Sequence, residues 1–167
     1  MATILQTQRL TLRELQISDL DYIAELLADR EVMRFWDRIY SRAESLEWIE
    51  RQQARYARDG FAYWLALETA TAKPVGQAGV LLQRINGRDE AGLAYIIDKA
   101  HWRCGFATEA AASSLQFIRS SLGRRRAISL IRPENIPSLG VARKLDMHEE
   151  ARLPYWGFEH IVFVKEL

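Results

Sequence analysis

Residues 93–122 decide the fold: they read LAYIIDKAHWRCGFATEAAASSLQFIRSSL. The apolar run Leu93–Ile97 predicts a buried strand that ends at Asp98. After a short loop, apolar residues recur at positions 111, 115, 118 and 122, which is the spacing of one helix face. The sequence therefore predicts a strand, a loop and a helix that begins around Gly105.

A helix that begins directly after a strand offers a site for an anion. Its first backbone N–H groups lack partners within the helix, and the helix dipole places partial positive charge there. Gly105 lets a ligand approach the backbone, because no Cβ stands in the way. The alternative is an ordinary connection with a turn glycine. Neither a Walker loop nor a dinucleotide-binding motif is present, since residues 101–110 contain one glycine only.

The remaining elements follow from hydrophobic alternation, helix caps and turn residues. The pattern predicts strands at Arg9–Arg13, Ala62–Glu68, Val75–Gln83, Glu90–Ile97, Ala127–Ile131 and His160–Lys165, and helices after Ser18, from Ser41 to about Tyr56, and at Pro137, with an Asn86-Gly87 hairpin turn. The expected order, β-α-α-β-β-β-α-β-α-β-β, counts one further strand before His160–Lys165 and implies an α/β (α+β) fold with a mixed sheet and helices on its faces. We expect one domain over residues 1–167.

Composition limits the partners and the location. A net charge of +1 gives no global field that attracts nucleic acid or anionic lipid. Cys104 is the only cysteine, so an internal disulfide is excluded. No signal peptide and no membrane-spanning run is visible, so we expect a cytoplasmic protein that uses neither nucleic acid nor membrane.

Histidine spacing and the tryptophans indicate structural roles. His101, His148 and His160 show no metal-ligand spacing, and we predict no metal site. We interpret Arg124-Arg125-Arg126 as a solvated cluster after a helix end. The five tryptophans are expected mainly in the core, although Phe35-Trp36 lies in a connecting segment.

The segment Trp102-Arg103-Cys104-Gly105-Phe106-Ala107-Thr108-Glu109-Ala110 resembles the acetyl-CoA pyrophosphate loop of the GCN5-related N-acetyltransferase (GNAT) superfamily, in its ribosomal-protein N-terminal acetyltransferase branch (RimJ/RimL type). That branch usually reads Trp-Gly-x-Gly-Tyr-Ala-Thr-Glu-Ala. The segment 7–13 is similar to its opening strand, and segments 132–138 and 143–145 are similar to its second cofactor-contacting element. The chain departs from the family at Arg103, at Gly92 and at Ala142, where glycine, glutamate and tyrosine are usual.

The resemblance implies a GNAT-type domain that binds acetyl-CoA, with the pantetheine arm paired to backbone at a split in the sheet. The cofactor-binding residues it implies are Ile96, Ile97, Arg103, Cys104, Gly105, Phe106, Ala107, Thr108, Asn135, Ser138 and Lys144. Glu109 is expected to have a structural role at the helix start.

Acyl transfer from a thioester to an amine needs a neutral amine, stabilisation of the developing oxyanion and protonation of the leaving thiolate. Glu90 is the candidate base, directly or through a water, against the alternative of a solvated strand residue. Backbone N–H groups near Ile96 and Ile97 are candidate oxyanion donors. Ser138 is the candidate acid in place of the missing tyrosine, against the alternative of a helix cap.

The leading hypothesis is an acetyl-CoA-dependent N-acetyltransferase in which a primary amine attacks the thioester directly within a ternary complex. The acceptor is a protein N-terminus, as in ribosomal-protein acetylation, or a small-molecule amine, and the sequence leaves this choice open. A catalytically inactive acyl-CoA-binding sensor or interaction module is the alternative. The resemblance is also compatible with a homodimer.

Overall fold

The structure is a computed structural model that describes residues 2–167. The strand and helix around residue 93 are β5 (Arg88–Ile97) and α3 (Phe106–Ser120). The other strands are β1 (Thr3–Gln6), β2 (Leu10–Glu14), β3 (Tyr63–Glu68), β4 (Pro74–Ile85), β6 (Arg126–Ile131), β7 (His148–Tyr155) and β8 (Phe158–Glu166); the other α-helices are α1 (Leu20–Ala28), α2 (Arg42–Asp59) and α4 (Ile136–Lys144).

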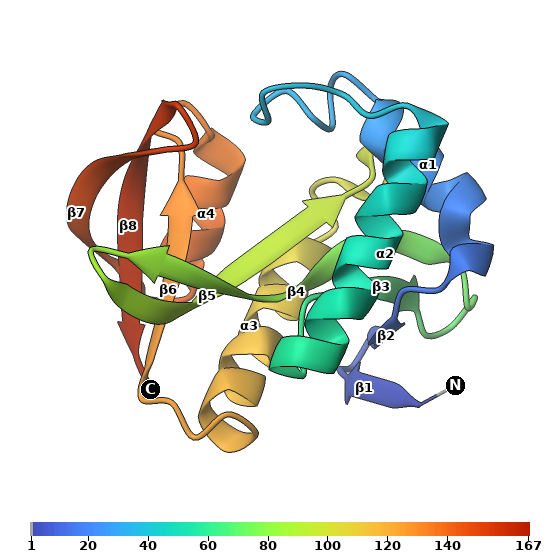
Figure 1. Cartoon of the computed structure of the whole chain (residues 1–167). Coiled ribbons are helices and arrows are strands. Elements are labelled where there is room, and N and C mark those ends of the chain that lie inside the picture. Colours follow the sequence, from blue (N-terminus) through green and yellow to red (C-terminus); the bar gives the residue numbers. More distant parts are fainter. Residues whose placement is uncertain (1) are drawn as a thin grey trace.

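The strands form one mixed sheet in the order β1-β2-β3-β4-β5-β6-β8-β7 (Figure 1). All neighbouring strands are antiparallel except β5 and β6, which run parallel. These two strands share a single register pair, Gly92 with Ile128, and then diverge. The sheet is therefore split between the C-terminal halves of β5 and β6.

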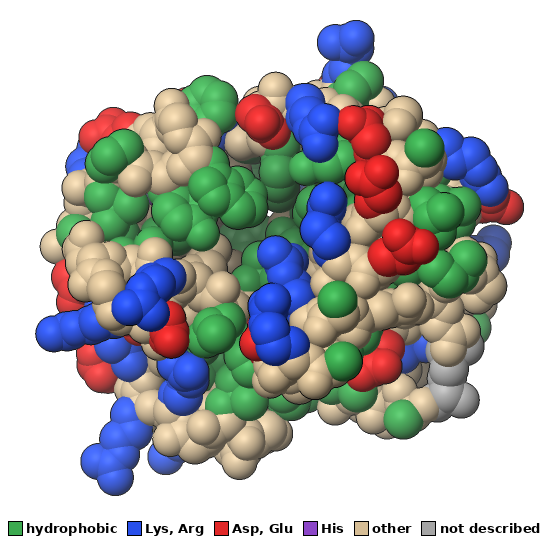
Figure 2. Space-filling view, in the orientation of Figure 1, with side chains coloured by type: hydrophobic (Ala, Val, Ile, Leu, Met, Phe, Trp, Pro, Cys, Tyr) green, Lys and Arg blue, Asp and Glu red, His purple; other side chains and the backbone are tan. Residues whose placement is uncertain are grey.

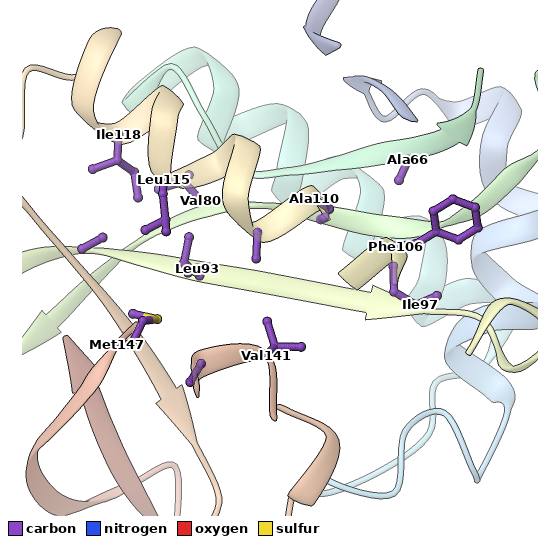
Figure 3. Close-up of a cluster of buried hydrophobic side chains, with 14 of the residues drawn as sticks. Ala66, Val80, Leu93, Ile97, Phe106, Ala110, Leu115, Ile118, Val141 and Met147 are labelled. Atoms are coloured by element: carbon purple, nitrogen blue, oxygen red, sulfur yellow. The ribbon is translucent and has the colours of Figure 1, made fainter. Parts of the chain in front are cut away.

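Two apolar clusters attach helices to opposite faces of the sheet. On one face, Ala110, Leu115 and Ile118 of α3 pack with Val80 and Leu93, and α4 joins the same cluster (Figure 3). On the other face, side chains of α1 and α2 pack against β3 and β5, including Ile23, Leu27, Ile49, Leu65 and Ile96. Burying each large aliphatic side chain contributes roughly 1.5–3 kcal/mol to the stability of the fold. This burial attaches α3 and α4 to one face of the sheet and α1 and α2 to the other.

The expected fold class is confirmed, and several local signals form as predicted. Ser41 and Glu44 make a reciprocal capping box, with the Ser41 N–H donating to Glu44 Oε2 at 2.7 Å. Asn86 and Gly87 both have positive φ, 48° and 78°, as a two-residue hairpin turn requires.

Two predictions of the sequence differ from the structure. An additional strand, β1, precedes the expected first strand; it is a short edge strand with largely exposed side chains, so it carries little periodic signal. Ser18 does not cap α1 but lies inside a one-turn 3₁₀ helix, Ile17–Asp19. The Asp19 carboxylate holds this turn in place, because it accepts hydrogen bonds from the Gln16 N–H at 2.8 Å and from the Arg13 guanidinium.

Within residues 2–167, no helix combines the length and the apolar character needed to cross a membrane. Nor do the described side chains include a group of three or more His, Cys, Asp or Glu residues arranged to hold a metal ion.

Candidate active site

The strand–helix loop (residues 98–105) presents unpaired amides at the start of α3. Gly105 is the N-cap residue, with φ of 84°, and it supplies no side chain to cap the helix. The first backbone bond of the helix runs from the Glu109 N–H to the Gly105 oxygen at 3.0 Å. The N–H groups of Phe106, Ala107 and Thr108 donate to no acceptor within residues 2–167. Free amides at a helix start, together with the helix dipole, are an arrangement that suits an anion.

Arg103 adopts a conformation that normally selects glycine. Its φ is 61°, in the left-handed region, and its side chain is exposed. A non-glycine residue there costs on the order of 1 kcal/mol. This strain gives a physical reason for the glycine usual at this position in the resembling family, and Arg103 adds a cation beside the free amides.

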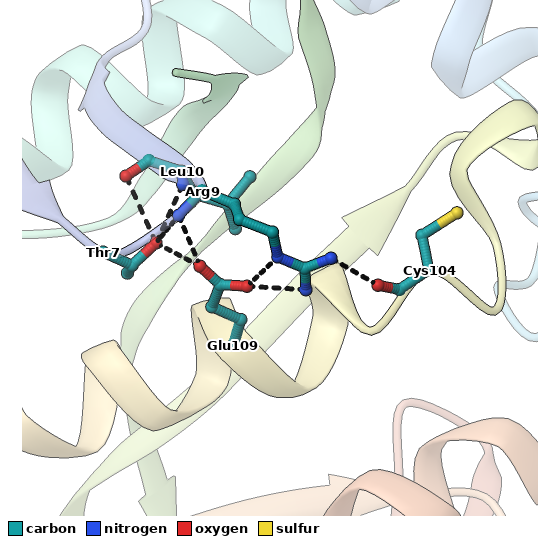
Figure 4. Close-up of polar contacts among 5 residues, drawn as sticks. All are labelled: Thr7, Arg9, Leu10, Cys104 and Glu109. Carbon is teal, nitrogen blue, oxygen red and sulfur yellow. Dashed lines mark hydrogen bonds and ion pairs between the residues drawn. The ribbon is translucent and has the colours of Figure 1, made fainter. Parts of the chain in front are cut away.

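A polar network fixes the loop to the N-terminal segment (Figure 4). The Glu109 carboxylate accepts from Thr7 Oγ1 at 2.6 Å, from the Arg9 N–H at 2.8 Å and from Arg9 Nε at 2.7 Å. Arg9 Nη1 in turn donates to the Cys104 carbonyl at 2.9 Å, and its guanidinium lies 4.6 Å from the centre of the Phe106 ring. Glu109 is therefore an internal anchor, which agrees with its expected structural role.

The charge of Glu109 is favoured by these contacts. Burial opposes its ionisation, but hydrogen bonds from Thr7 and Arg9 and the ion pair with Arg9 outweigh this and lower the pKa of Glu109 below its usual value. The Arg9 side chain remains 44% exposed, so it adds positive potential next to the loop.

The pairing of β5 with β4 fixes which backbone N–H groups of β5 point into the gap between β5 and β6. The Asp98 N–H donates to Val75 of β4 at 3.0 Å, so alternate amides, including that of Ile96, also point towards β4. The amides of Tyr95 and Ile97 consequently point into the gap, where the Ile97 carbonyl accepts from Trp102 Nε1 at 2.8 Å. Of the two predicted oxyanion donors, the geometry favours Ile97 and not Ile96, and it adds Tyr95.

The central cleft lies where the sheet splits and has a volume of about 160 Å³ (Figure 2 shows the hollow between apolar side chains). Its lining is mainly aromatic and apolar, and the few polar groups come from separate elements. The lining side chains used below are Phe35, Trp36, Asp37, Gln83, Tyr95, Arg132, Asn135, Ser138, Tyr155, Trp156, Phe158 and His160.

Ser138 and Asn135 lie at the start of α4, where the sequence predicted them. Asn135 is the N-cap residue, and its Oδ1 accepts from the Ser138 N–H at 3.2 Å. The helix cap is therefore Asn135, which binds the Ser138 N–H, and not Ser138. Ser138 also lines the cleft. Ala142, one turn later on α4, is buried at 1% exposure.

Tyr95 is a site residue that the sequence analysis missed. Its side chain comes from β5 and lines the cleft beside Ser138. Burial raises the pKa of Tyr95 to about 12, and the Ser138 contact opposes the shift only in part. The phenol therefore stays protonated at neutral pH. In the sequence it is hidden inside an apolar run, so only the fold reveals it.

Glu90, the predicted base, is placed apart from these groups. It is 8% exposed, it is not part of the cleft lining, and its carboxylate lies 3.1 Å from Arg126 Nε. Arg126 also pairs with Glu150 at 2.5 Å. Glu90 is therefore placed as one partner of an ion pair with Arg126. The expectation that Arg126 is a solvated cation is wrong, because it pairs with both carboxylates.

Two further expectations change in the structure. Lys144 is exposed in the last turn of α4, at the opposite end of that helix from Ser138. Trp156 is not a core residue: it is 75% exposed at the tip of the β7–β8 hairpin, stacks on Tyr155 and lines the cleft.

Arg132 connects the two sides of the cleft. Its guanidinium donates to the Phe35 carbonyl of the α1–α2 loop at 3.3 Å and to Glu134 at 2.6 Å, and it lies 4.0 Å from the centre of the Phe158 ring. The α1–α2 loop and the β8 strand are thereby held on either side of one opening.

Comparison with known proteins agrees with this geometry. Residues 9–148 match the model of the acetyltransferase (GNAT) domain family. The chain is 26% identical over 155 residues to the uncharacterized N-acetyltransferase p20 of Bacillus licheniformis, covering 89% of this chain and 84% of that protein.

Two solved structures illustrate the similarity of fold. An acetyltransferase from Agrobacterium tumefaciens str. C58 superposes with a TM-score of 0.84 at 21% identity, covering 100% of this chain and 95% of the other. RimL, a ribosomal L7/L12 alpha-N-protein acetyltransferase in complex with coenzyme A, gives a TM-score of 0.80 at 16% identity, with 99% and 98% covered.

The unpaired amides at α3, the split between β5 and β6 and the family match lead to one conclusion. The chain belongs to the GNAT acetyltransferase family and is an N-acetyltransferase.

Proposed function

We propose that this protein transfers the acetyl group of acetyl-CoA to a primary amine of low pKa, such as a protein N-terminal α-amine, by direct attack. The observation that carries the proposal is the position of two features on one strand–loop–helix segment: unpaired backbone of β5 at the sheet split, beside the cleft, and free amides at the start of α3. The cytoplasmic location and the oligomeric state stay predictions.

The described residues fit acetyl-CoA as a co-substrate. The amides of residues 106–108, with Arg9 and Arg103 beside them, suit its pyrophosphate, because that group needs donors and positive potential. The amides of Tyr95 and Ile97 suit its pantetheine arm or the thioester oxygen. Lys144 has no comparable support, because it lies at the far end of α4.

The chemistry divides between the acceptor and the cleft. The amine nitrogen attacks the thioester carbonyl, the C–N bond forms, the C–S bond breaks, and the amine loses a proton to solvent. Ser138 donates its hydroxyl proton towards the departing thiolate, while the protonated Tyr95 phenol orients and replenishes it from solvent. The pKa of an α-amine, about 8, is about 2.5 units below that of lysine. Bringing the α-amine into its neutral form at pH 7 therefore costs roughly 3.4 kcal/mol less free energy.

The N-terminal α-amine is favoured as acceptor by two considerations. The structurally similar RimL is a ribosomal L7/L12 alpha-N-protein acetyltransferase. In addition, no carboxylate base other than Asp37 lines the cleft among the described residues, so an acceptor that is already neutral suits this site.

The test is free-thiol release from acetyl-CoA with a panel of peptides with free N-termini, matched N-blocked lysine peptides and small amines. We expect turnover with the free N-termini. Ser138→Ala should lower kcat about 30-fold, the value of a hydrogen bond to a charged group of about 2 kcal/mol. Full activity of Ser138→Ala would remove Ser138 from the mechanism.

A second candidate function is an acyl-CoA-binding sensor without turnover. It is favoured by Gly92 and Ala142, which lack the side chains usual in the resembling family. Binding of acetyl-CoA in calorimetry without thiol release from any amine in the panel would support this candidate.

A further inference from the structure

Gln83 of β4 occupies space next to Gly92 at the wall of the central cleft. A Cβ at Gly92 would lie 1.9 Å from Gln83 Oε1 and 2.7 Å from Gln83 Cδ. The carboxamide therefore fills the place of a side chain at position 92. The glycine at 92 and the glutamine at 83 are thus complementary, and this relation is invisible without the β4–β5 pairing.

The carboxamide lies on the face of the sheet that α1 and α2 cover. In the β4–β5 register Gln83 is opposite Glu90 and Leu81 is opposite Gly92, so these side chains share one face. Leu81 and Ala94 on that face pack against the cluster formed with α1 and α2. The α3 helix and its free amides are on the other face, so Gln83 approaches the split from the side opposite those amides.

Gln83 Oε1 is fully buried and accepts no hydrogen bond from any residue within 2–167. Its register partner on β5, Glu90, forms an ion pair with Arg126. An unsatisfied buried oxygen costs about 1–3 kcal/mol. A hydrogen-bond donor carried by a substrate at the cleft wall would satisfy this oxygen.

We propose that the Gln83 carboxamide positions the acceptor: its Oε1 accepts one N–H of the neutral primary amine and so directs the nitrogen lone pair at the thioester. This inference rests on the proposed acetyl transfer. A carboxamide takes up no proton at neutral pH, so Gln83 positions the amine and does not deprotonate it. The substrate class is therefore primary amines with a low pKa, such as α-amines, and the released proton goes to solvent.

Other titratable side chains also line the cleft, among them Asp37 and His160. Asp37 comes from the α1–α2 loop, and His160 comes from β8, where its Nδ1 lies 3.0 Å from the Phe158 carbonyl. Tyr95 is held protonated, and Arg132 and Glu134 are bound to each other. If Asp37 or His160 acted as a base, the rate would follow an ionisation of the enzyme and not of the acceptor.

The pH profile separates these possibilities. The intact protein is assayed by thiol release from about pH 6 to about pH 9.5 with two peptides whose N-terminal amines differ in pKa by about one unit. We expect log(kcat/KM) for the acceptor to rise with pH and to level off at the pKa of each acceptor. If log(kcat/KM) levelled off at the same pH for both peptides, the profile would identify an enzyme base and overturn the inference.

Variants test the contact itself. Gln83→Leu should raise the acceptor KM about 5- to 10-fold, the value of a hydrogen bond of about 1–1.4 kcal/mol, with the KM for acetyl-CoA unchanged. Gln83→Glu should add an ionisable group and increase the relative rate with lysine amines. Gln116→Leu, on the exposed side of α3, is the matched control and should change neither constant.

The outcomes distinguish the inference from the proposed function. Absence of thiol release by the wild-type protein with every amine means that the proposed function has failed. Normal turnover with an unchanged acceptor KM in Gln83→Leu, in a variant whose thermal midpoint equals or exceeds that of the wild type, overturns the role of Gln83 alone. If Gln83→Leu does not fold, the same readouts on Gln83→Met, which keeps the length of the side chain and removes the carboxamide oxygen, decide the question.

Discussion

The two sides of the split sheet are built in different ways. On the cofactor side, residues 103–108 form a short continuous segment that offers backbone N–H groups, held by the contacts of Glu109 with Thr7 and Arg9. On the acceptor side, the lining side chains come from β4, the α1–α2 loop and the β7–β8 hairpin. A backbone site depends on local conformation, whereas a side-chain site depends on which elements meet. Substitutions on the two sides should therefore change different kinetic constants.

In this comparison, the largest change in a kinetic constant is expected for Tyr95, which lies between the two sides. Tyr95→Phe removes the hydroxyl beside Ser138, and we expect kcat to fall about 20-fold with both KM values nearly unchanged, because a hydrogen bond that supports a developing charge is lost. Steady-state kinetics with acetyl-CoA and a peptide acceptor measure this. A change confined to the acceptor KM would instead place Tyr95 wholly on the acceptor side.

On the cofactor side, Gly105→Ala should raise the KM for acetyl-CoA about 10-fold, because a left-handed alanine costs roughly 1–2 kcal/mol and distorts the amides. The new Cβ would also lie 3.3 Å from Arg9 Nη2. Gly123→Ala is the matched control: Gly123 has φ of 61° with no atom within 4 Å of an added Cβ. It should cost similar stability in a thermal melt and leave both KM values alone; equal KM effects in the two variants would refute a specific role for Gly105.

Glu109→Gln should have a smaller effect. Loss of the ion pair with Arg9 loosens the strand–helix loop, and we expect the KM for acetyl-CoA to rise about 3-fold, given roughly 0.7 kcal/mol for a partly exposed pair. The acceptor KM should not change.

The same substitution has a defined pH dependence. Because the folded protein lowers the pKa of Glu109, its charge stabilises the fold above the usual glutamate pKa of about 4.3, and this stability is lost as pH falls through the folded value. Urea unfolding below about pH 5 should therefore depend less on pH in Glu109→Gln than in the wild type. Equal acid sensitivity of the two proteins would contradict the assigned anchoring role.

The smallest effect is expected for Arg103→Gly. Glycine relieves the left-handed strain at φ of 61°, but it also increases the freedom of the unfolded chain, so the net change in stability should stay within about 1 kcal/mol. Loss of the cation should raise the KM for acetyl-CoA about 2-fold, most clearly at low salt. An increase that is the same at low and high salt would argue against a phosphate contact.

Much of the cofactor side was predictable from sequence, because its signals are local. The strand Leu93–Ile97, the glycine at 105 and the helix stripe lie within 30 consecutive residues, and each belongs to a short-range rule for strands, turns or helix starts. The short strand β1 escaped prediction for a similar reason: an edge strand with exposed side chains leaves almost no pattern.

The sequence by itself determined the order of elements from β2 onward, the Ser41 capping box, the Asn86-Gly87 turn, the family resemblance and the position of the strand–helix loop, since these depend on neighbours along the chain. Only the tertiary structure decided that Tyr95 meets Ser138, that Gln83 fills the place beside Gly92, and that Glu90 is bound to Arg126. Those relations join residues up to 43 positions apart through strand pairing and helix packing, and the register of a sheet is a property of the whole fold.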